Sequence, residues 1–424
     1  MFFLFLLLMK RFPYILFSLF FYFCFINQTV AGGFHLNLQG QKQLGMAHCG
    51  TASVFDASVL FFNPGAMSFL DSTNSICAGS NFIFPRLAYL EPSPGIYTSE
   101  MVKNISTPFS FYAAFKFKKT SKWNMGLGIY TPFGSHAQWE NDWKGQFLIR
   151  EIELRSFFIQ PTFSYKINDK LGIGGGYVFA TGDFYLRKGV PVQNMDGTYG
   201  EATLKGKANS KGGYNVGLYY ACTKKLYVGI DYRSAVKLNI PAGEALFENI
   251  PSSLSSYFAS TSFSTQLTLP SVATLGTSYF LNDKFKIASD INYVGWKSYD
   301  TLSIDFAANT DKLADVNSAR SYSNSFVFRL GAEYSPTKKI TVRIGTYFDQ
   351  SPVKNGFVSP ESPDMNKIGF TAGTTVTLGQ HLKIDASFLW IEGLKRSDTT
   401  LETQFAGTYK VRALSPGIGI EYVF

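Results

Sequence analysis

The sequence predicts an all-β protein: a transmembrane antiparallel β-barrel of 14 strands, with its lumen plugged by an N-terminal hatch. Three observations predict this fold. Apolar and polar residues alternate with a period of two from about residue 74 onward, short and long connections alternate along the chain, and the last strand ends at an aromatic residue, Phe424. The expected domains are a signal peptide at residues 1–31, the hatch at 32–72 and the barrel at 73–424.

The composition indicates a chain that faces lipid. Aromatic residues reach 17% while charged residues fall to 16%, against roughly 25% charged residues in soluble domains. Mean hydropathy is nevertheless close to zero, whereas a helical membrane protein needs several apolar runs of about 20 residues. The apolar residues are therefore interleaved with polar ones. The net charge of +9 comes from scattered cations and short turns, which favours a solvated surface and no nucleic-acid partner.

The long apolar run at residues 12–26 follows Lys10 and Arg11 and is followed by small residues ending at Ala31. A basic start, an apolar centre and a small-residue end are the three parts of a secretory signal peptide. We therefore expect cleavage after Ala31. An uncleaved helical anchor is the alternative, and Met9 is an alternative start of the chain.

The strand pattern is clear in residues 226–233, where one face is apolar and the other carries Asp231 and Arg233. The same alternation recurs at residues 326–334 and 382–390. A soluble β-sandwich alternates too, but its strands are usually only about five or six residues long. Many segments here reach the roughly 9–11 residues that a tilted strand needs to cross a bilayer, so strand length favours the membrane.

The connections sort into two kinds without exception. The short polar ones lie around Thr120-Ser121, Asn168-Asp169, Thr223-Lys224, Asn282-Asp283, Pro336-Thr337 and Gly379-Gln380. The long ones lie near residues 85–107, 133–149, 186–200, 239–260, 298–319, 350–365 and 396–408. Bacterial outer-membrane barrels have short periplasmic turns, long outer loops and an even number of strands. This alternation predicts the strand number and a location in the bacterial outer membrane.

By parity, the polar strand faces turn inward and give the lumen charges of both signs, which suggests paired charges. The inward set is Asp231, Arg233, Arg329, Glu333, Arg343, Lys383 and Asp385. The last strand, residues 417–424, alternates and ends in Phe424, which resembles the signal read by the barrel-assembly machinery. That machinery and the outer-membrane lipid are therefore expected partners.

Residues 32–72 lack strand alternation and precede the first strand. They are rich in Gly, Ala and Ser and contain Asn63-Pro64-Gly65, a turn signal. Such a segment ahead of a closed barrel can plug its lumen. A mobile periplasmic tail is the alternative.

Several segments, in this order along the chain, resemble the long-chain fatty acid transporter family of outer-membrane proteins (FadL/TodX/OMPP1 type). Near the expected mature start stands Gly32-Gly33-Phe34-His35-Leu36-Asn37, followed by Leu44-Gly45-Met46-Ala47. Asn63-Pro64-Gly65-Ala66 is similar to the family's Asn-Pro-Ala motif, with Gly65 where Ala is usual. Further resemblance lies in Tyr130-Thr131-Pro132-Phe133-Gly134 with Trp139 and Trp143, in Gly295-Trp296-Lys297-Ser298-Tyr299-Asp300 and in Ser362-Pro363-Asp364.

The resemblance implies a 14-stranded barrel plugged by an N-terminal hatch. It also implies that long-chain fatty acids or other hydrophobic compounds enter from outside and leave sideways into the membrane beside a kinked third strand. Gly126, Gly128 and Pro132 offer a physical reason for the kink, because glycine and proline weaken or interrupt ladder pairing. Our hypothesis is passive, binding-driven transfer in which the hatch around Asn63-Pro64-Gly65 shifts.

A fatty acid would also need a cation for its carboxylate. Arg155, Arg329 and Arg343 are the candidates by inward parity, with lumen salt bridges as their alternative role. An apolar lumen accepts alkyl and aromatic bodies alike, so the substrate is left open between fatty acids and aromatic hydrocarbons.

Catalysis and cofactors find little support in the sequence, and we expect no enzyme, no cofactor and no metal site. His35, His48, His136 and His381 show no metal-ligand spacing, and no Gly-x-Ser-x-Gly motif is present. The glycine-rich residues 171–177 are better explained as a strand that packs on the hatch or a neighbour than as a nucleotide loop.

Two alternative functions remain open. One is a phospholipase-like enzyme, which would need a histidine and a serine paired on the outer rim; only His136 lies in a predicted outer loop, and the sequence alone does not pair it with its neighbour Ser135. The other is a structural or adhesive barrel without transport. Cys49 and Cys77 could form one disulfide in an oxidising periplasm, but the odd number of mature cysteines excludes a disulfide framework.

Overall fold

A computed structural model describes residues 33–72, 74–118 and 120–424. The expected signal peptide, residues 1–31, lies outside the described residues. No helix in the described part of the chain is long and apolar enough to cross a membrane.

The described chain is almost entirely antiparallel sheet. Its strands are β1 (Asn74–Asn81), β2 (Phe84–Leu90), β3 (Thr98–Glu100), β4 (Phe109–Lys116), β5 (Trp123–Tyr130), β6 (Gly134–Gln138), β7 (Glu151–Lys166), β8 (Leu171–Gln193), β9 (Tyr199–Ser210), β10 (Gly213–Ala221), β11 (Leu226–Arg233), β12 (Val236–Glu248), β13 (Thr261–Leu269), β14 (Val272–Asn282), β15 (Phe285–Val294), β16 (Thr301–Phe306), β17 (Val316–Ala319), β18 (Ser325–Tyr334), β19 (Ile340–Asp349), β20 (Lys367–Leu378), β21 (Leu382–Gly393), β22 (Arg396–Thr399) and β23 (Ala406–Val423). The helices are α2 (Gln41–Leu44), α3 (Val59–Phe62), η1 (Pro64–Phe69), η2 (Ser252–Tyr257) and η3 (Trp296–Ser298).

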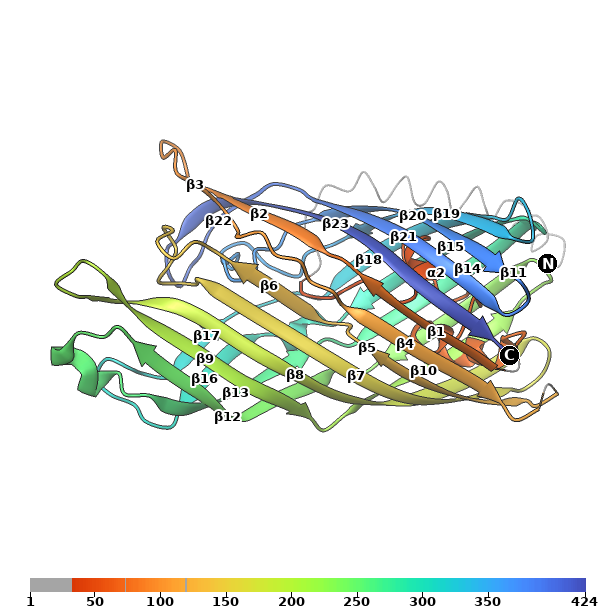
Figure 1. Cartoon of the computed structure of the whole chain (residues 1–424), viewed down its shortest axis with the longest axis horizontal. Coiled ribbons are helices and arrows are strands. Elements are labelled where there is room, and N and C mark those ends of the chain that lie inside the picture. The colour runs from red at the N-terminus through yellow and green to blue at the C-terminus, as the bar shows by residue number, and fades with distance from the viewer. Residues whose placement is uncertain (1–32, 73, 119) are drawn as a thin grey trace, which may run out of the picture.

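These strands form a closed barrel of 14 antiparallel spans, which confirms the predicted all-β, 14-stranded barrel (Figure 1). Several spans consist of two consecutive strands separated by a bend, such as β5 and β6. The barrel closes where β1 pairs with β23, with Ser75 opposite Val423 and Asn81 opposite Gly417. Closure pairs the two edge strands of the sheet with each other, so the backbone groups along β1 and β23 are satisfied within the barrel wall.

The direction of the side chains follows the predicted alternation. β11 spans Leu226–Arg233, the same residues as the predicted strand. Its apolar Ile230 and Tyr232 are exposed on the outer surface, while Asp231 and Arg233 are buried in the lumen. Apolar side chains that point outward are in contact with lipid and carry no penalty for exposure to water. Polar side chains that point inward form hydrogen bonds and ion pairs inside the barrel.

The six short connections lie where they were predicted, between β4 and β5, β7 and β8, β10 and β11, β14 and β15, β18 and β19, and β20 and β21. The predicted long connections are partly strand. β8 continues to Gln193 and β12 to Glu248, well into ranges expected to be loop. Antiparallel pairing of β8 with β9 and of β9 with β12 continues there, so the ladder extends the wall at the end opposite the C-terminus (Figure 1).

Residues 33–72, here called the N-terminal segment, fold against the inward face of the barrel near the end that carries the C-terminus (Figure 1). Almost all of residues 37–70 are buried. The short helix α2 packs on β20 and β21, and η1 packs on β7, β8 and β10. The segment therefore touches strands from several parts of the barrel circumference.

Charged side chains hold the N-terminal segment to the wall. Lys42 lies 3.0 Å from Asp56 of the same segment, 3.8 Å from Asp385 of β21, and also pairs with Glu421 of β23. Burial by itself would raise the pKa of Asp56, but the Lys42 ammonium and hydrogen bonds from Ser58 outweigh it and lower the pKa to about 2. Asp56 is therefore a carboxylate at neutral pH.

Cys49 and Cys77 are both buried and both free, so the disulfide considered from the sequence is absent. Cys49 belongs to the N-terminal segment and packs near Met46 and Ala288, whereas the Cys77 thiol lies 3.5 Å from the Asp56 carboxylate. Each thiol fills a separate place in the packing.

Candidate functional site

The third transmembrane span is broken between β5 and β6. Tyr130 at the end of β5 pairs with Phe158 of β7, and Gly134 at the start of β6 pairs with Arg155 of β7. Residues 131–133 therefore lie opposite residues 156 and 157, which is a β-bulge of one extra residue. Pro132 lies at the centre of this bulge and has no N–H to donate to a ladder.

Gly126 and Gly128 do not cause the break, so the prediction that they weaken the ladder is wrong. Both lie in the regular part of β5, paired with β4 on one side and β7 on the other. A methyl group added to either glycine would lie 2.9 Å from a methyl carbon of Leu60. The two glycines instead give the N-terminal segment room to approach the third span.

The backbone carbonyls freed by the bulge are satisfied mainly by the N-terminal segment. Leu36 N donates to Pro132 O at 2.8 Å, and Gln39 Nε2 donates to Thr131 O at 3.0 Å. Ser156 of β7 completes the set by donating its hydroxyl to Phe133 O at 2.6 Å. The start of the segment thus takes the place of a strand partner at the break.

Beyond the bulge, the second and third spans are joined only sparsely. Among the described residues, a single backbone hydrogen bond connects them past Tyr130, from Val102 N to Gln138 O at 2.7 Å. The Asn104 amide also contacts the His136 ring at 3.1 Å. The seam beside the bulge therefore lacks a continuous ladder of the kind that joins β20 to β21.

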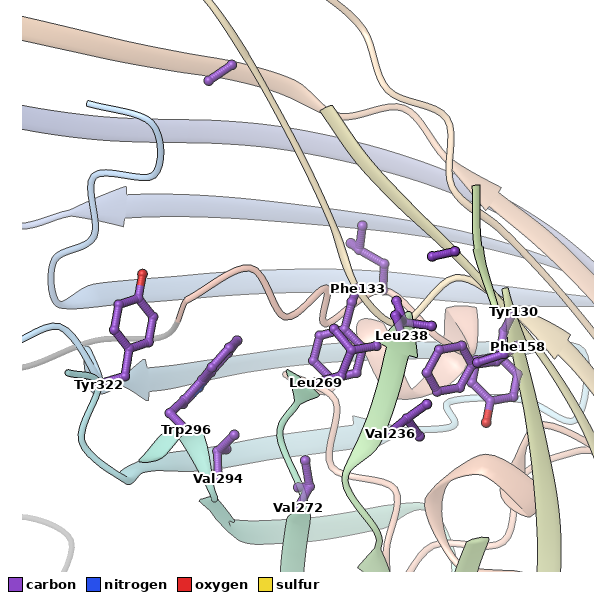
Figure 2. Packing of buried hydrophobic residues seen from close by; sticks show 14 of the residues in the cluster. Tyr130, Phe133, Phe158, Val236, Leu238, Leu269, Val272, Val294, Trp296 and Tyr322 are labelled. Carbon is purple, nitrogen blue, oxygen red and sulfur yellow. The ribbon is translucent and has the colours of Figure 1, made fainter. Parts of the chain in front are cut away.

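An aromatic cluster connects the start of the N-terminal segment to the bulge. The Phe34 ring lies 4.9 Å from Trp296, 5.7 Å from Tyr299 and 6.3 Å from Phe133, all edge to face. Figure 2 shows Phe158 next to Tyr130 at one end of this region, Trp296 with Tyr322 at the other, and Phe133 between them. The sequence motifs that lie far apart in the chain converge here.

Asp364 holds the first described residue of the segment. Its carboxylate accepts a hydrogen bond from Gly33 N at 3.0 Å, another from the Ser351 hydroxyl at 2.5 Å, and an ion pair from Lys367 at 2.6 Å. The motif Ser362-Pro363-Asp364 therefore positions the start of the N-terminal segment.

A largely apolar cavity lies on the outer side of Phe34. Its aromatic lining comes from Phe34, Phe184, Tyr299 and Tyr322, and its aliphatic lining from Ile152, Leu154, Ala208, Leu238, Ile240, Leu267 and Leu302. The even-numbered residues of β7 face it, so this is the interior of the barrel wall. Concave apolar cavities with few polar groups are where small molecules usually bind.

One ion pair lies in the lining of this cavity. Arg320 Nη1 lies 2.6 Å from Glu361 Oε2, which joins the chain after β17 to the connection between β19 and β20. Neither residue was found from the sequence, because both lie in connections where no periodicity tells which side chains point inward. No other charged side chain lines this cavity within the described chain.

The three arginines proposed from parity behave differently. Arg155 points outward, is 57% exposed on its side chain and pairs with Glu153 at 2.6 Å, so its predicted inward direction is wrong. The inward positions of β7 are the even-numbered ones, such as Phe158 and Gln160, so the odd-numbered Arg155 faces outward. Arg155 is therefore not placed to meet a ligand in the lumen.

Arg329 and Arg343 point inward as predicted but are engaged by the protein. Arg329 donates to Asn37 at 2.7 Å and to Asn292 at 2.6 Å, and Arg343 donates to Glu333 at 2.6 Å. Neither arginine lines the apolar cavity. Arg343 forms a lumen salt bridge, which was its alternative role. Arg329 instead hydrogen-bonds uncharged groups of β15 and of the N-terminal segment.

Arg233 is a further contact between the segment and the third span. Its Nη1 donates to the Tyr130 hydroxyl and its Nη2 to Phe61 O, each at 2.6 Å. Tyr130 is the last residue before the bulge, and Phe61 belongs to α3 of the segment. Parity had placed Arg233 in the lumen, but only the structure shows which two elements it joins.

The motif Asn63-Pro64-Gly65 fixes the centre of the segment. The Asn63 amide donates to Thr51 O at 2.8 Å and to Leu218 O at 2.9 Å, and its side-chain oxygen accepts from Gly65 N at 3.0 Å. A methyl group on Gly65 would lie 2.7 Å from Gly217 O and 2.8 Å from Gly172 O.

The barrel wall therefore comes too close to Gly65 to leave room for a side chain. The glycine-rich strand was expected to pack on the hatch or on a neighbour, and it packs on the N-terminal segment, since Gly172 and Gly174 of β8 face Gly65 and Pro64.

Ser135 and His136 do not form a catalytic pair. Ser135 lines the interior cavity, whereas His136 lies on the other face of β6 and contacts Glu151 at 3.2 Å. His48 is buried in the segment and His35 is half-buried. Desolvation first, and then Arg329, lower the pKa of His35 to about 3. No group of side chains suited to a metal ion occurs among the described residues.

A closed membrane barrel, an internal segment docked at a broken third span and an apolar cavity together define an outer-membrane transport barrel. The chain belongs to the family described as outer membrane protein transport protein (OMPP1/FadL/TodX), whose match covers residues 22–424. The family consists of transport proteins, which agrees with the prediction that the chain is not an enzyme.

Several relatives support this assignment. The putative outer membrane protein NMB0088 of Neisseria meningitidis is 23% identical, over 93% of this chain and 94% of the relative. The long-chain fatty acid transport protein of Escherichia coli strain K12 is 22% identical, over 87% of this chain and 89% of the relative.

Two solved structures show the same fold. A Pseudomonas aeruginosa FadL homologue superposes with a TM-score of 0.80 at 18% identity, over 93% of this chain and 100% of the other. The Ralstonia pickettii toluene transporter TbuX superposes with a TM-score of 0.69 at 16% identity, over 91% and 98%.

Proposed function

We propose that this outer-membrane transport protein takes up hydrophobic small molecules through the apolar cavity and releases them sideways into the membrane at the bulge of the third span. The observation that carries the proposal is the position of Phe34 and Leu36. Phe34 lines the cavity, and two residues further on Leu36 donates to Pro132 O in the bulge. One short piece of chain thus separates the ligand cavity from the break in the wall.

Release into lipid suits such cargo physically. An apolar solute gains roughly 0.8 kcal/mol for each methylene that stays out of water. A sideways exit at the bulge keeps the solute in apolar surroundings, because Phe133 and Phe158 line the interior there and lipid lies outside. Passage down the lumen would instead meet the Lys42 cluster and the other buried charges of the N-terminal segment.

The N-terminal segment acts as the hatch in this proposal. Residues 32–72 form the plug domain and residues 73–424 the barrel domain. A ligand that enters the cavity competes with the Phe34 ring for the contacts with Tyr299 and Trp296. Displacement of Phe34 withdraws Leu36 from Pro132, while Asn63-Pro64-Gly65 keeps the rest of the segment attached to the wall.

Two cargo classes are to be considered. Long-chain fatty acids are the compounds for which the Escherichia coli relative is named, and toluene is the compound for which the Ralstonia transporter is named. The barrel-assembly machinery, which would read the last strand ending at Phe424, and outer-membrane lipid are the further partners that we propose.

Deletion of Pro132 tests the exit. Removing one residue from the bulge restores equal numbers of residues between the paired positions and lets β5 and β6 join as one regular strand. We expect uptake of labelled hydrophobic compounds by whole cells to fall to the level of cells without the protein, while ligand binding by the purified barrel persists.

Pro132→Ala is the matched control, because it keeps the chain length and hence the bulge, and we expect it to retain most of the uptake. Normal uptake by a folded Pro132 deletion would refute lateral release at this position.

A further inference from the structure

Among the described residues, Arg320 is the one cationic side chain that lines the cavity, and a carboxylate already neutralises it. Arg320 Nη1 lies 2.6 Å from Glu361 Oε2, and their side chains are only 11% and 21% exposed. The remaining lining is apolar or carries hydroxyl groups, from Ser135, Thr265 and Ser362. The cavity therefore offers a balanced charge pair rather than a free positive charge.

From this we infer that the cavity selects uncharged aromatic compounds, with or without a neutral oxygen substituent, over carboxylates of the same size. The inference rests on the proposed function and specifies the cargo of the same cavity. A carboxylate entering the cavity has to face Glu361 and compete with it for Arg320, in surroundings where water is scarce and like charges repel strongly. An uncharged molecule is not repelled by Glu361 and does not compete with it for Arg320.

The aromatic lining supports the second part of the inference. Phe34, Phe184, Tyr299 and Tyr322 contribute rings to the cavity wall, and Tyr299 and Tyr322 meet edge to face at 5.0 Å. Flat rings gain from edge-to-face contacts with such a wall beyond the effect of buried area.

Arg320 also supplies a group for a neutral oxygen. Its Nε is buried and has no hydrogen-bond acceptor among the described residues, while its Nη1 is held by Glu361. A buried N–H donor without a partner is unfavourable. A hydroxyl or carbonyl oxygen of an uncharged ligand could accept from this N–H without disturbing the ion pair.

The test compares 1-naphthol with 1-naphthoate, which share a ring system and differ in charge at pH 7. Titration calorimetry on the purified full-length barrel in detergent gives both affinities. We expect the unaltered protein to bind 1-naphthol at least about tenfold more tightly than 1-naphthoate. Comparing variants with the unaltered protein cancels the partitioning of each ligand into micelles.

Glu361→Gln removes the negative charge with little change in shape. We expect it to raise affinity for 1-naphthoate at least about tenfold, because Arg320 becomes free to pair with the ligand, and to leave 1-naphthol within about threefold. Arg320→Gln leaves Glu361 alone in the cavity, and we expect it to weaken 1-naphthoate further.

Glu153→Gln is the matched control, because Glu153 belongs to another arginine–glutamate pair, with Arg155, that faces outward. We expect it to change neither affinity. A folded barrel migrates faster on a gel before heating than after heating has unfolded it. This difference checks that each variant is folded.

Equal affinity for the two ligands in the unaltered protein, or an unchanged ratio in a folded Glu361→Gln variant, would overturn the inference. If no hydrophobic ligand of either kind binds to the folded protein, the proposed function itself fails, and the inference fails with it. Tight binding of 1-naphthoate that Glu361→Gln does not alter would overturn the inference alone.

Discussion

Replacing Phe34 by alanine should loosen the part of the N-terminal segment that covers the bulge. Phe34 makes edge-to-face contacts with Trp296, Tyr299 and Phe133 at 4.9, 5.7 and 6.3 Å. Such pairs contribute about 0.5–1.5 kcal/mol each beyond area burial. Because the third pair is widely spaced, we take the ring-contact energy lost in Phe34→Ala to be on the order of 1–3 kcal/mol. A loss of this size raises the population in which the start of the segment has left the bulge about 5- to 150-fold.

Hydrogen exchange reports this opening directly. The Leu36 N–H donates to Pro132 O and the Gly134 N–H donates to Phe34 O, so both amides become exchangeable when the start of the segment leaves the bulge. We expect Phe34→Ala to accelerate exchange at both amides by the same factor, as measured by mass spectrometry of short peptides.

Amides of β11 should keep their protection, because they lie in a continuous ladder with β10 and β14. Phe163→Ala is the control, since Phe163 is an outward ring on β7 with 54% exposure. Unchanged exchange at Leu36 and Gly134 in Phe34→Ala would refute the idea that these ring contacts hold the segment at the break.

Three further predictions concern the segment and the lumen. Gly65→Ala should destabilise the docked segment by about 1–3 kcal/mol, because its methyl group meets Gly217 O and Gly172 O. Gly175→Ala is the control, since the nearest atom to its added methyl group lies at 3.4 Å. We expect the denaturant midpoint of Gly65→Ala to lie below that of the control. The pKa of Asp56 is lowered to about 2, so the stability that its carboxylate contributes is present above the ordinary carboxyl pKa and is lost as pH falls through about 2. In Asp56→Asn, the free energy of unfolding should therefore change less with pH between about pH 4 and pH 2. An unchanged pH dependence would contradict the assignment. Arg155→Ala should leave uptake of hydrophobic compounds unchanged, because the side chain faces outward; a loss of uptake with normal amounts of folded protein would contradict the orientation.

The strand pattern could be predicted because each strand faces two different solvents. Residues 226–233 are apolar on the lipid face and polar on the lumen face, so a period of two in the sequence marks the strand without any tertiary information. The short turns were equally visible, since polar residues break the alternation. Strand ends beyond the membrane, as in β8 and β12, could not be located, because both faces there meet water or protein.

The functional site was only partly predictable. Pro132 marks the bulge in the sequence because proline cannot donate to a ladder. Gly126 and Gly128 look similar in sequence but serve a different purpose, since what limits them is Leu60, more than 60 positions away. A glycine by itself does not tell whether the backbone bends there or a neighbour comes close.

The sequence by itself determined the barrel, the number of its spans, its membrane and its family, because local alternation, turn residues and ordered motifs encode all four. Only the tertiary structure decided which polar groups meet. Leu36 with Pro132, Arg233 with Tyr130 and Phe61, and Arg320 with Glu361 are contacts between parts of the chain far apart in sequence. Such contacts depend on barrel closure and on the course of the N-terminal segment inside it, and no local pattern carries that information.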